Sequence, residues 1–191
     1  MDVPSTYRCL PYPRLERDAF AVRAVQPGDI ESIRQWRNDQ MDVLRQSVTI
    51  QPEAQSAYFA RHVWPSFDDE QPAQVLLAVE ESGELIGYGG LVHIAWEHRR
   101  AEVSFLLATE LARDEAKHLT RFARFLGLMK ELAFEGLQFH RLTTETFAFR
   151  TGHIATLESS GFRREGQMRD HVLVDGTFWD SLIHGCLADD D

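Results

Sequence analysis

Residues 101–136 read AEVSFLLATELARDEAKHLTRFARFLGLMKELAFEG, and this stretch decides the fold. Residues 101–107 alternate between apolar and polar and then become wholly apolar, as in a central strand covered on both faces. From about Asp114 the period changes to that of a helix. An apolar stripe follows, formed by Phe122, Phe125, Leu126, Met129, Leu132 and Ala133. The stripe predicts a long helix that lies on a sheet and ends near Gly136.

The segments on either side repeat this alternation of strands and helices. Upstream, the patterns predict strands at 20–25, 74–80 and 85–94 and helices at about 30–37 and 51–64. Downstream, they predict a strand at 141–147, a short helix at about 154–160 and a hairpin of 167–174 with 177–187, joined at Asp175-Gly176. The order predicts an α/β (α+β) fold with a single mixed, mostly antiparallel central sheet and flanking helices.

The chain length of 191 residues is suited to one domain with one sizeable core. Residues 1–18 contain three prolines and no regular period, so we interpret them as an N-terminal leader that packs on the surface or is partly loose. The domain would then cover residues 19–191.

Composition excludes several classes of protein. A formal net charge of −10 argues against a general nucleic-acid binder, which needs a basic surface. The apolar runs are too short to span a membrane, and the start lacks the pattern of a secretory signal. Cys9 and Cys186 are the only cysteines, and no histidine or cysteine motif has metal-ligand spacing. We therefore expect a cytoplasmic protein with no metal.

Four local strings resemble the GNAT superfamily of N-acetyltransferases. They are IRQWRN at 33–38, LIGYGGL at 85–91, AEVSF at 101–105, and GFRREG at 161–166, which leads into Arg169 and DGTFWD at 175–180. In this order they span about residues 20–187. They are most similar to the branch of ribosomal-protein N-terminal acetyltransferases and of enzymes that acetylate nucleotide-linked amino sugars.

The resemblance implies a GNAT fold and direct transfer of an acetyl group from the co-substrate acetyl-CoA to a primary amine. The thioester would lie in a gap between two splayed strands, bordered by the backbone of Phe105, Leu106 and Leu107, whose amides would stabilise the oxyanion. A general base would remove a proton from the acceptor ammonium, and no covalent enzyme intermediate would form.

The sequence departs from the family where the CoA diphosphate is held. The family places Gln or Arg, then Gly, then Gly or Ala at the start of the long helix, and these positions fall here on Lys117, Thr120 and Phe122. Without glycine, side chains would have to replace the backbone donors; the candidates are Lys117, His118, Thr120, Arg121 and Arg150. Alternatively, Arg113, Lys117, Arg121 and Arg124 form the solvent-exposed face of the helix. Phe122 could also fill the space of the diphosphate.

Glu102 is the predicted general base, because its strand is apolar enough to be central, and Ser104 shares its face. The alternative is an ordinary polar position at a strand end. The family's usual Asn, Ser and Tyr fall on Arg150, His153 and Leu157, so the tyrosine that often acts as general acid is absent. His153 could act as acid or base, or it could be a core histidine.

By resemblance, Trp36, Arg37, Asn38 and Arg45 would border the acceptor groove. There Arg could pair with a diphosphate and Trp could stack on a base or sugar. Alternatively, Trp36 is a core anchor and Arg37 a charge at a helix end. An acidic groove would instead favour a peptide amine or a polyamine.

The resemblance therefore implies an acetyl-CoA-dependent N-acetyltransferase whose acceptor is a small amine, most plausibly a nucleotide-linked amino sugar. One alternative is a GNAT-fold protein without normal CoA use, either a binding or regulatory module or an enzyme with another acyl carrier. Another is a protein N-terminal acetyltransferase. The expected partner is a small-molecule amine, with no nucleic acid and no membrane, and a homodimer is compatible with the sequence.

Overall fold

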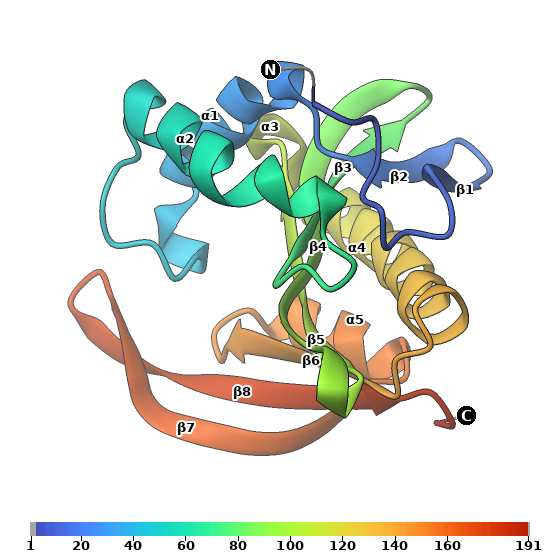
Figure 1. Ribbon diagram of the computed structural model, residues 1–191. Coiled ribbons are helices and arrows are strands. Elements are labelled where there is room, and N and C mark those ends of the chain that lie inside the picture. The colour runs from blue at the N-terminus through green and yellow to red at the C-terminus, as the bar shows by residue number, and fades with distance from the viewer. Residues whose placement is uncertain (1–2, 191) are drawn as a thin grey trace.

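The computed structural model describes residues 3–190 and contains one eight-stranded sheet, in the order β1-β2-β3-β4-β5-β6-β8-β7 (Figure 1). The strands are β1 Arg14–Arg17, β2 Phe20–Ala24, β3 Val75–Glu81, β4 Glu84–Ala95, β5 Arg100–Leu107, β6 Arg141–Phe147, β7 Arg163–Val174 and β8 Thr177–Leu187. β5 and β6 run parallel, and the other neighbouring strands of the described chain are antiparallel. The predicted class, a single mixed and mostly antiparallel sheet, is confirmed.

Helices cover both faces of this sheet (Figure 1). On one face lie α1 (Ile30–Asp39) and α2 (Pro52–Tyr58), which contact each other. On the other face lie α4 (Glu115–Lys130) and α5 (Thr151–Ser159), which also contact each other. The short helix α3 (Thr109–Ala112) connects β5 to α4.

The apolar stripe packs against β5, as its period predicts. Its first four residues lie on α4, and Leu132 and Ala133 lie in the π-helical turn Glu131–Gly136 that continues α4. All six stripe residues are buried. The Phe105 ring on β5 lies 5.2 Å from the Phe122 ring and 4.7 Å from the Phe125 ring. Burial of these aromatic side chains, each worth a few kcal/mol, fixes α4 across the middle of the sheet.

The N-terminal segment is held by specific contacts. Tyr7 is fully buried, its ring stacks on Phe67 at 3.9 Å, and its hydroxyl accepts a hydrogen bond from the Leu76 amide. Residues 14–17 form the edge strand β1 and pair with β2. This strand was not predicted, because three of its four side chains are exposed and its sequence does not alternate.

A glycine at the bend of β4 allows close contact with β3. Gly90 has φ +128°, and a Cβ atom there would lie 2.1 Å from the Val75 carbonyl oxygen. We expect Gly90→Ala to lower the free energy of unfolding by about 3 kcal/mol, since it adds backbone strain to a clash with main chain. Urea denaturation measures the change. The control is Gly127→Ala on α4, where nothing lies within 4 Å of the added methyl group, and it should stabilise the protein by roughly 0.5–1 kcal/mol. An equal loss of unfolding free energy in both variants would contradict the explanation.

Candidate active site

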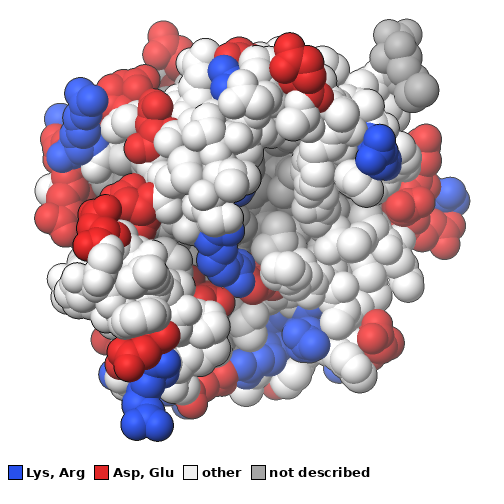
Figure 2. All heavy atoms as spheres, turned by 90° about the vertical axis from the view of Figure 1, so that its left-hand side faces the viewer, with Lys and Arg blue, Asp and Glu red and all other residues white. Residues whose placement is uncertain are grey.

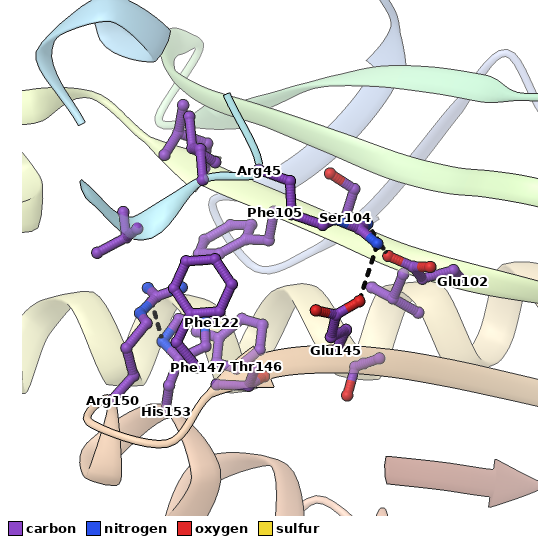
Figure 3. A pocket seen from close by; sticks show the side chains of 15 residues that line it. Arg45, Glu102, Ser104, Phe105, Phe122, Glu145, Thr146, Phe147, Arg150 and His153 are labelled. Carbon is purple, nitrogen blue, oxygen red and sulfur yellow. Dashed lines mark hydrogen bonds and ion pairs between the residues drawn. The ribbon is translucent and has the colours of Figure 1, made fainter. Parts of the chain in front are cut away.

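β5 and β6 pair over three residues and then separate, which opens a gap in the sheet. The last paired residues are Glu102 and Thr143, whereas β5 stays paired with β4 as far as Leu107. The other edge of β5 therefore presents backbone groups that no strand satisfies. A cavity of about 100 Å³ in this gap, here named the strand cavity, is lined by Glu102, Ser104, Phe105, Phe122, Glu145, Phe147, Arg150 and His153, among others (Figure 3).

Arg45 bridges the two separated strands. It lies on the connection between α1 and α2, and its guanidinium contacts Glu102 on β5 and, at 3.1 Å, Glu145 on β6 (Figure 3). The two carboxylate side chains are largely buried, with 18% and 11% of their surface exposed, whereas the Arg45 side chain is 48% exposed. The gap is thus closed on this side by one cation between two carboxylates.

A larger groove meets the strand cavity at Arg45 and Ser104, which line both. This outer groove of about 950 Å³ runs under the α1–α2 connection and along β4; its lining includes Arg37, Tyr58, His62, Asp69 and His93. Figure 2 shows this face of the molecule hollowed, with both basic and acidic side chains along its margin. The two spaces together form a continuous candidate site for two substrates.

An aromatic stack closes the end of the strand cavity next to α4. The His153 ring of α5 stacks on the Phe122 ring with centroids 3.8 Å apart and planes 16° apart, and Phe105 lies on the other side of Phe122. His118 approaches His153 at 5.2 Å. Phe122 is 3% exposed, so its ring fills this position, as the absence of glycine suggested.

His153 and Arg150 line this end of the strand cavity, and His118 lies behind His153. Burial, and then the charges of Arg150 and Arg121, lower the pKa of His118 to about 4. Burial, the Arg150 charge and His118 lower the pKa of His153 well below its ordinary value. Burial lowers the pKa of Arg150 to about 10. Arg150 Nη2 lies 3.3 Å from His153 Nδ1, which must accept because its partner can only donate.

These buried histidines make stability depend on pH. The folded chain keeps His118 deprotonated down to about pH 4, whereas the unfolded chain takes up the proton near pH 6.5, so stability falls as the pH drops between these values. The free energy of unfolding should therefore fall between pH 7 and pH 4.5, and replacing His118 by Leu should make this fall smaller by roughly 2 kcal/mol. Unfolding free energies at the two pH values measure this. His98→Leu is the control, since the His98 side chain is 65% exposed, and an equal effect there would refute the assignment.

The predicted phosphate ligands on α4 point elsewhere. Lys117 is exposed and pairs with Asp114 at 3.1 Å, and the Thr120 hydroxyl donates to the Ala116 carbonyl. Arg121 donates to Glu81 through Nε and Nη2 at 3.0 and 2.6 Å. None of these three, nor His118, lines the strand cavity. Neighbouring carboxylates or the helix backbone engage polar groups of Lys117, Thr120 and Arg121, whereas neither ring nitrogen of His118 has a partner among the described residues. A role for these residues as phosphate ligands stays a prediction.

The site fits one end of CoA and not the other. The unpaired edge of β5 from 103 to 107 suits an extended thioester arm, which can add as a strand would. At α4, however, Asp114 caps the first turn with its own carboxylate, accepting the Lys117 amide at 3.2 Å, and Phe122 and His153 close the position beside it. A helix end that already carries a carboxylate disfavours a second anion. In this arrangement the helix end does not fit a diphosphate.

The four residues predicted to border the acceptor groove have different surroundings in the structure. Trp36 is 9% exposed and belongs to the core cluster, so it cannot border a groove. Asn38 exchanges two hydrogen bonds with the Ile50 backbone and thereby holds the α1–α2 connection. Arg37 does line the outer groove, but it donates to the Tyr88 hydroxyl at 2.6 Å and to Gln46. Among the four, Arg45 alone reaches the strand cavity.

Sequence reasoning missed two residues of the site. Glu145 lies in the middle of a strand that was correctly predicted. An isolated charge within such a strand could have indicated a functional residue. Asp114 precedes the long helix as an N-cap and was read only as its start. Within residues 3–190, no group of three or more His, Cys, Asp or Glu side chains could hold a metal ion. No helix of that range is long and apolar enough to cross a membrane.

Comparisons with known proteins agree with this geometry. A family model described as an acetyltransferase (GNAT) domain matches residues 22–183. An uncharacterized N-acetyltransferase of Bacillus subtilis, YoaA, is 21% identical over 91% of this chain and 96% of its own length. The crystal structure of a Vibrio cholerae spermidine N-acetyltransferase in complex with CoA and spermine has a TM-score of 0.77 at 20% identity, over 90% of this chain and 97% of that one.

A second structure of the Vibrio cholerae enzyme, described as dodecameric and in an intermediate state, has a TM-score of 0.71 at 21% identity and covers 89% of this chain and 94% of that one. The fold, the split between β5 and β6 and the family match together define an N-acetyltransferase. The chain belongs to the GNAT acetyltransferase family. Its class, predicted from the sequence, is that of an acetyl-CoA-dependent N-acetyltransferase.

Proposed function

We propose that this protein transfers an acetyl group from acetyl-CoA to a primary amine of a small aliphatic polyamine. The observation that carries the proposal is the pair of carboxylates, Glu102 and Glu145, which line the strand cavity and contact Arg45, a residue that lines both this cavity and the outer groove. Carboxylates at this point attract an acceptor that is itself cationic. The spermidine N-acetyltransferase with a similar fold supports the same substrate class.

The proposed roles follow from position. Glu102 accepts the proton that an ammonium must lose before its nitrogen can attack a thioester carbonyl, and Ser104 lies beside it on the same face of β5. The backbone amides of Phe105 and Leu107 face the unpaired edge and stabilise the developing oxyanion, whereas the Leu106 amide faces β4, like the Ala108 amide that donates to Ile86. His153 is neutral and held by Phe122 and Arg150, so we propose a structural role for it in place of acid–base catalysis.

A nucleotide-linked amino sugar is a weaker proposal. It would need arginines able to pair with a diphosphate, yet Arg37 donates to Tyr88 and Gln46, and Arg45 is neutralised by two carboxylates. Trp36, the expected stacking residue, is in the core. A protein N-terminus as acceptor has no specific contact in its favour.

A second candidate function is favoured by the closed end of the site. The Phe122–His153 stack and the Asp114 cap both oppose a diphosphate at α4. An enzyme of the same fold that takes its acetyl group from a shorter pantetheine thioester, or from another carrier, would need only the edge of β5.

One experiment tests both candidates. The purified chain is incubated with acetyl-CoA or with acetyl-pantetheine and with spermidine, a short peptide or a nucleotide-linked amino sugar, and products are identified by mass spectrometry. We expect acetyl-spermidine from acetyl-CoA. Product from acetyl-pantetheine alone would favour the second candidate, and acetylation of the amino sugar but not of spermidine would refute the proposed acceptor.

A further inference from the structure

We propose that Glu102 and Glu145 form the binding position of the acceptor's ammonium group, and that Arg45 occupies this position until the acceptor displaces it. The inference rests on the proposed function and extends it, because it assigns the acceptor subsite and a residue that controls access to it. Arg45 would then act as an internal substitute for the substrate cation.

The location of Arg45 supports this role. It lines both the outer groove and the strand cavity, together with Leu44 and Ser104, so an amine that moves from the groove into the cavity passes beside Arg45. Figure 3 shows its guanidinium between the two carboxylates, which come from the two strands that separate. An acceptor nitrogen must reach this gap to attack a thioester there.

The carboxylates are suited to an ammonium. Glu145 Oε1 is buried and has no hydrogen-bond partner among the described residues, although His171 Nε2 lies 3.6 Å away. An arginine fork that already contacts both carboxylates leaves this acceptor unsatisfied. A primary ammonium has three N–H donors on one atom and can serve both carboxylates and this oxygen. Leaving a buried acceptor unpaired is costly, so the exchange favours the amine.

Exchange of the two cations needs little rearrangement. The Arg45 side chain is 48% exposed, so it can leave towards solvent. The segment after Arg45 remains held, because the Asn38 side chain bonds to the Gln46 side chain and to the Ile50 backbone. One cation replaces another, and the two buried carboxylates stay compensated throughout.

The two cations differ in the chemistry they allow. A guanidinium does not give up its proton in a protein, so no proton can pass from Arg45 to Glu102 while the two side chains are in contact. An ammonium in the same place can transfer a proton to Glu102, which leaves the nitrogen able to attack. The structure therefore has a resting state in which the carboxylates are occupied and no proton moves.

Calorimetric titration of the donor-free protein with spermidine tests the inference. Arg45→Ala should lower the Kd for spermidine about fivefold or more, because the competing cation is gone, while Glu145→Gln should raise it. The matched control is Arg14→Ala, which removes another arginine that bridges two carboxylates, Glu16 and Glu80, far from the site. Unchanged or weaker binding by Arg45→Ala, relative to the control, would overturn the inference.

Turnover separates this inference from the proposed function. In Arg45→Ala, KM for the amine should fall with Kd. Tighter amine binding without acetylation of any amine would uphold the subsite and refute the function. Acetylation of spermidine with Kd and KM unmoved by Arg45→Ala would uphold the function and refute the role of Arg45.

Discussion

Replacing Glu102 by Gln is expected to lower kcat/KM for the acceptor amine by about a hundredfold or more, with the fold intact. General-base catalysis contributes factors of about 10² to 10⁴, and the amide cannot accept the proton of an ammonium. The Gln side chain keeps a carbonyl oxygen that can accept from Arg45, so the contact across the gap is retained. Steady-state rates at saturating thioester, with circular dichroism to confirm folding, measure the effect.

Two matched variants make this expectation specific. Glu97→Gln removes the same charge from a side chain that is 72% exposed and outside the cavity, and it should leave the rate unchanged. Glu145→Gln removes the other carboxylate of the pair and should mainly raise KM. If Glu102→Gln retained its rate while Glu145→Gln lost it, the base would be Glu145.

The layers of the fold were predictable because their signals are local. The alternation at 101–107 lies within one strand, and the stripe from Phe122 to Ala133 lies on α4 and the helical turn that continues it, so each pattern reports the face that its segment buries. The packing of α4 on β5 follows from these two faces alone. β1 was not predicted because an exposed edge strand of four residues has no buried face, and its sequence therefore does not alternate between apolar and polar residues.

The active site was predicted less completely because its contacts are distant in sequence. Glu102 and Ser104 could be proposed from their strand, but the ion pairs of Arg45 join residues 57 and 100 positions apart. Glu145 was therefore not connected to Glu102. Local pattern also cannot show whether a cation already has a partner, so the ion pairs of Lys117 with Asp114 and of Arg121 with Glu81 were not predicted.

Replacing Phe122 by Ala is expected to tighten CoA binding about tenfold or more while it destabilises the fold by about 3–5 kcal/mol. The ring closes the helix end of the strand cavity through its stack on His153, so CoA can use this end only when the two rings separate. When the arrangement with separated rings is only a minor state, the apparent affinity for CoA is lower than the intrinsic affinity by the fraction of molecules in that state. Removal of the Phe122 ring makes every molecule open and so restores the intrinsic affinity. Calorimetric titration with CoA measures the change.

Phe125→Ala is the matched control for Phe122→Ala, because Phe125 lies three residues further along α4, is fully buried and contacts the same Phe105 ring, yet does not line the cavity. It should cost similar stability without a gain in affinity. Pantetheine, which lacks the diphosphate, should bind both variants and the original protein alike, since it needs only the edge of β5. A gain for pantetheine equal to that for CoA would show that Phe122 restricts the thioester arm. Equal CoA affinity in all three proteins would show that the nucleotide lies elsewhere on the surface.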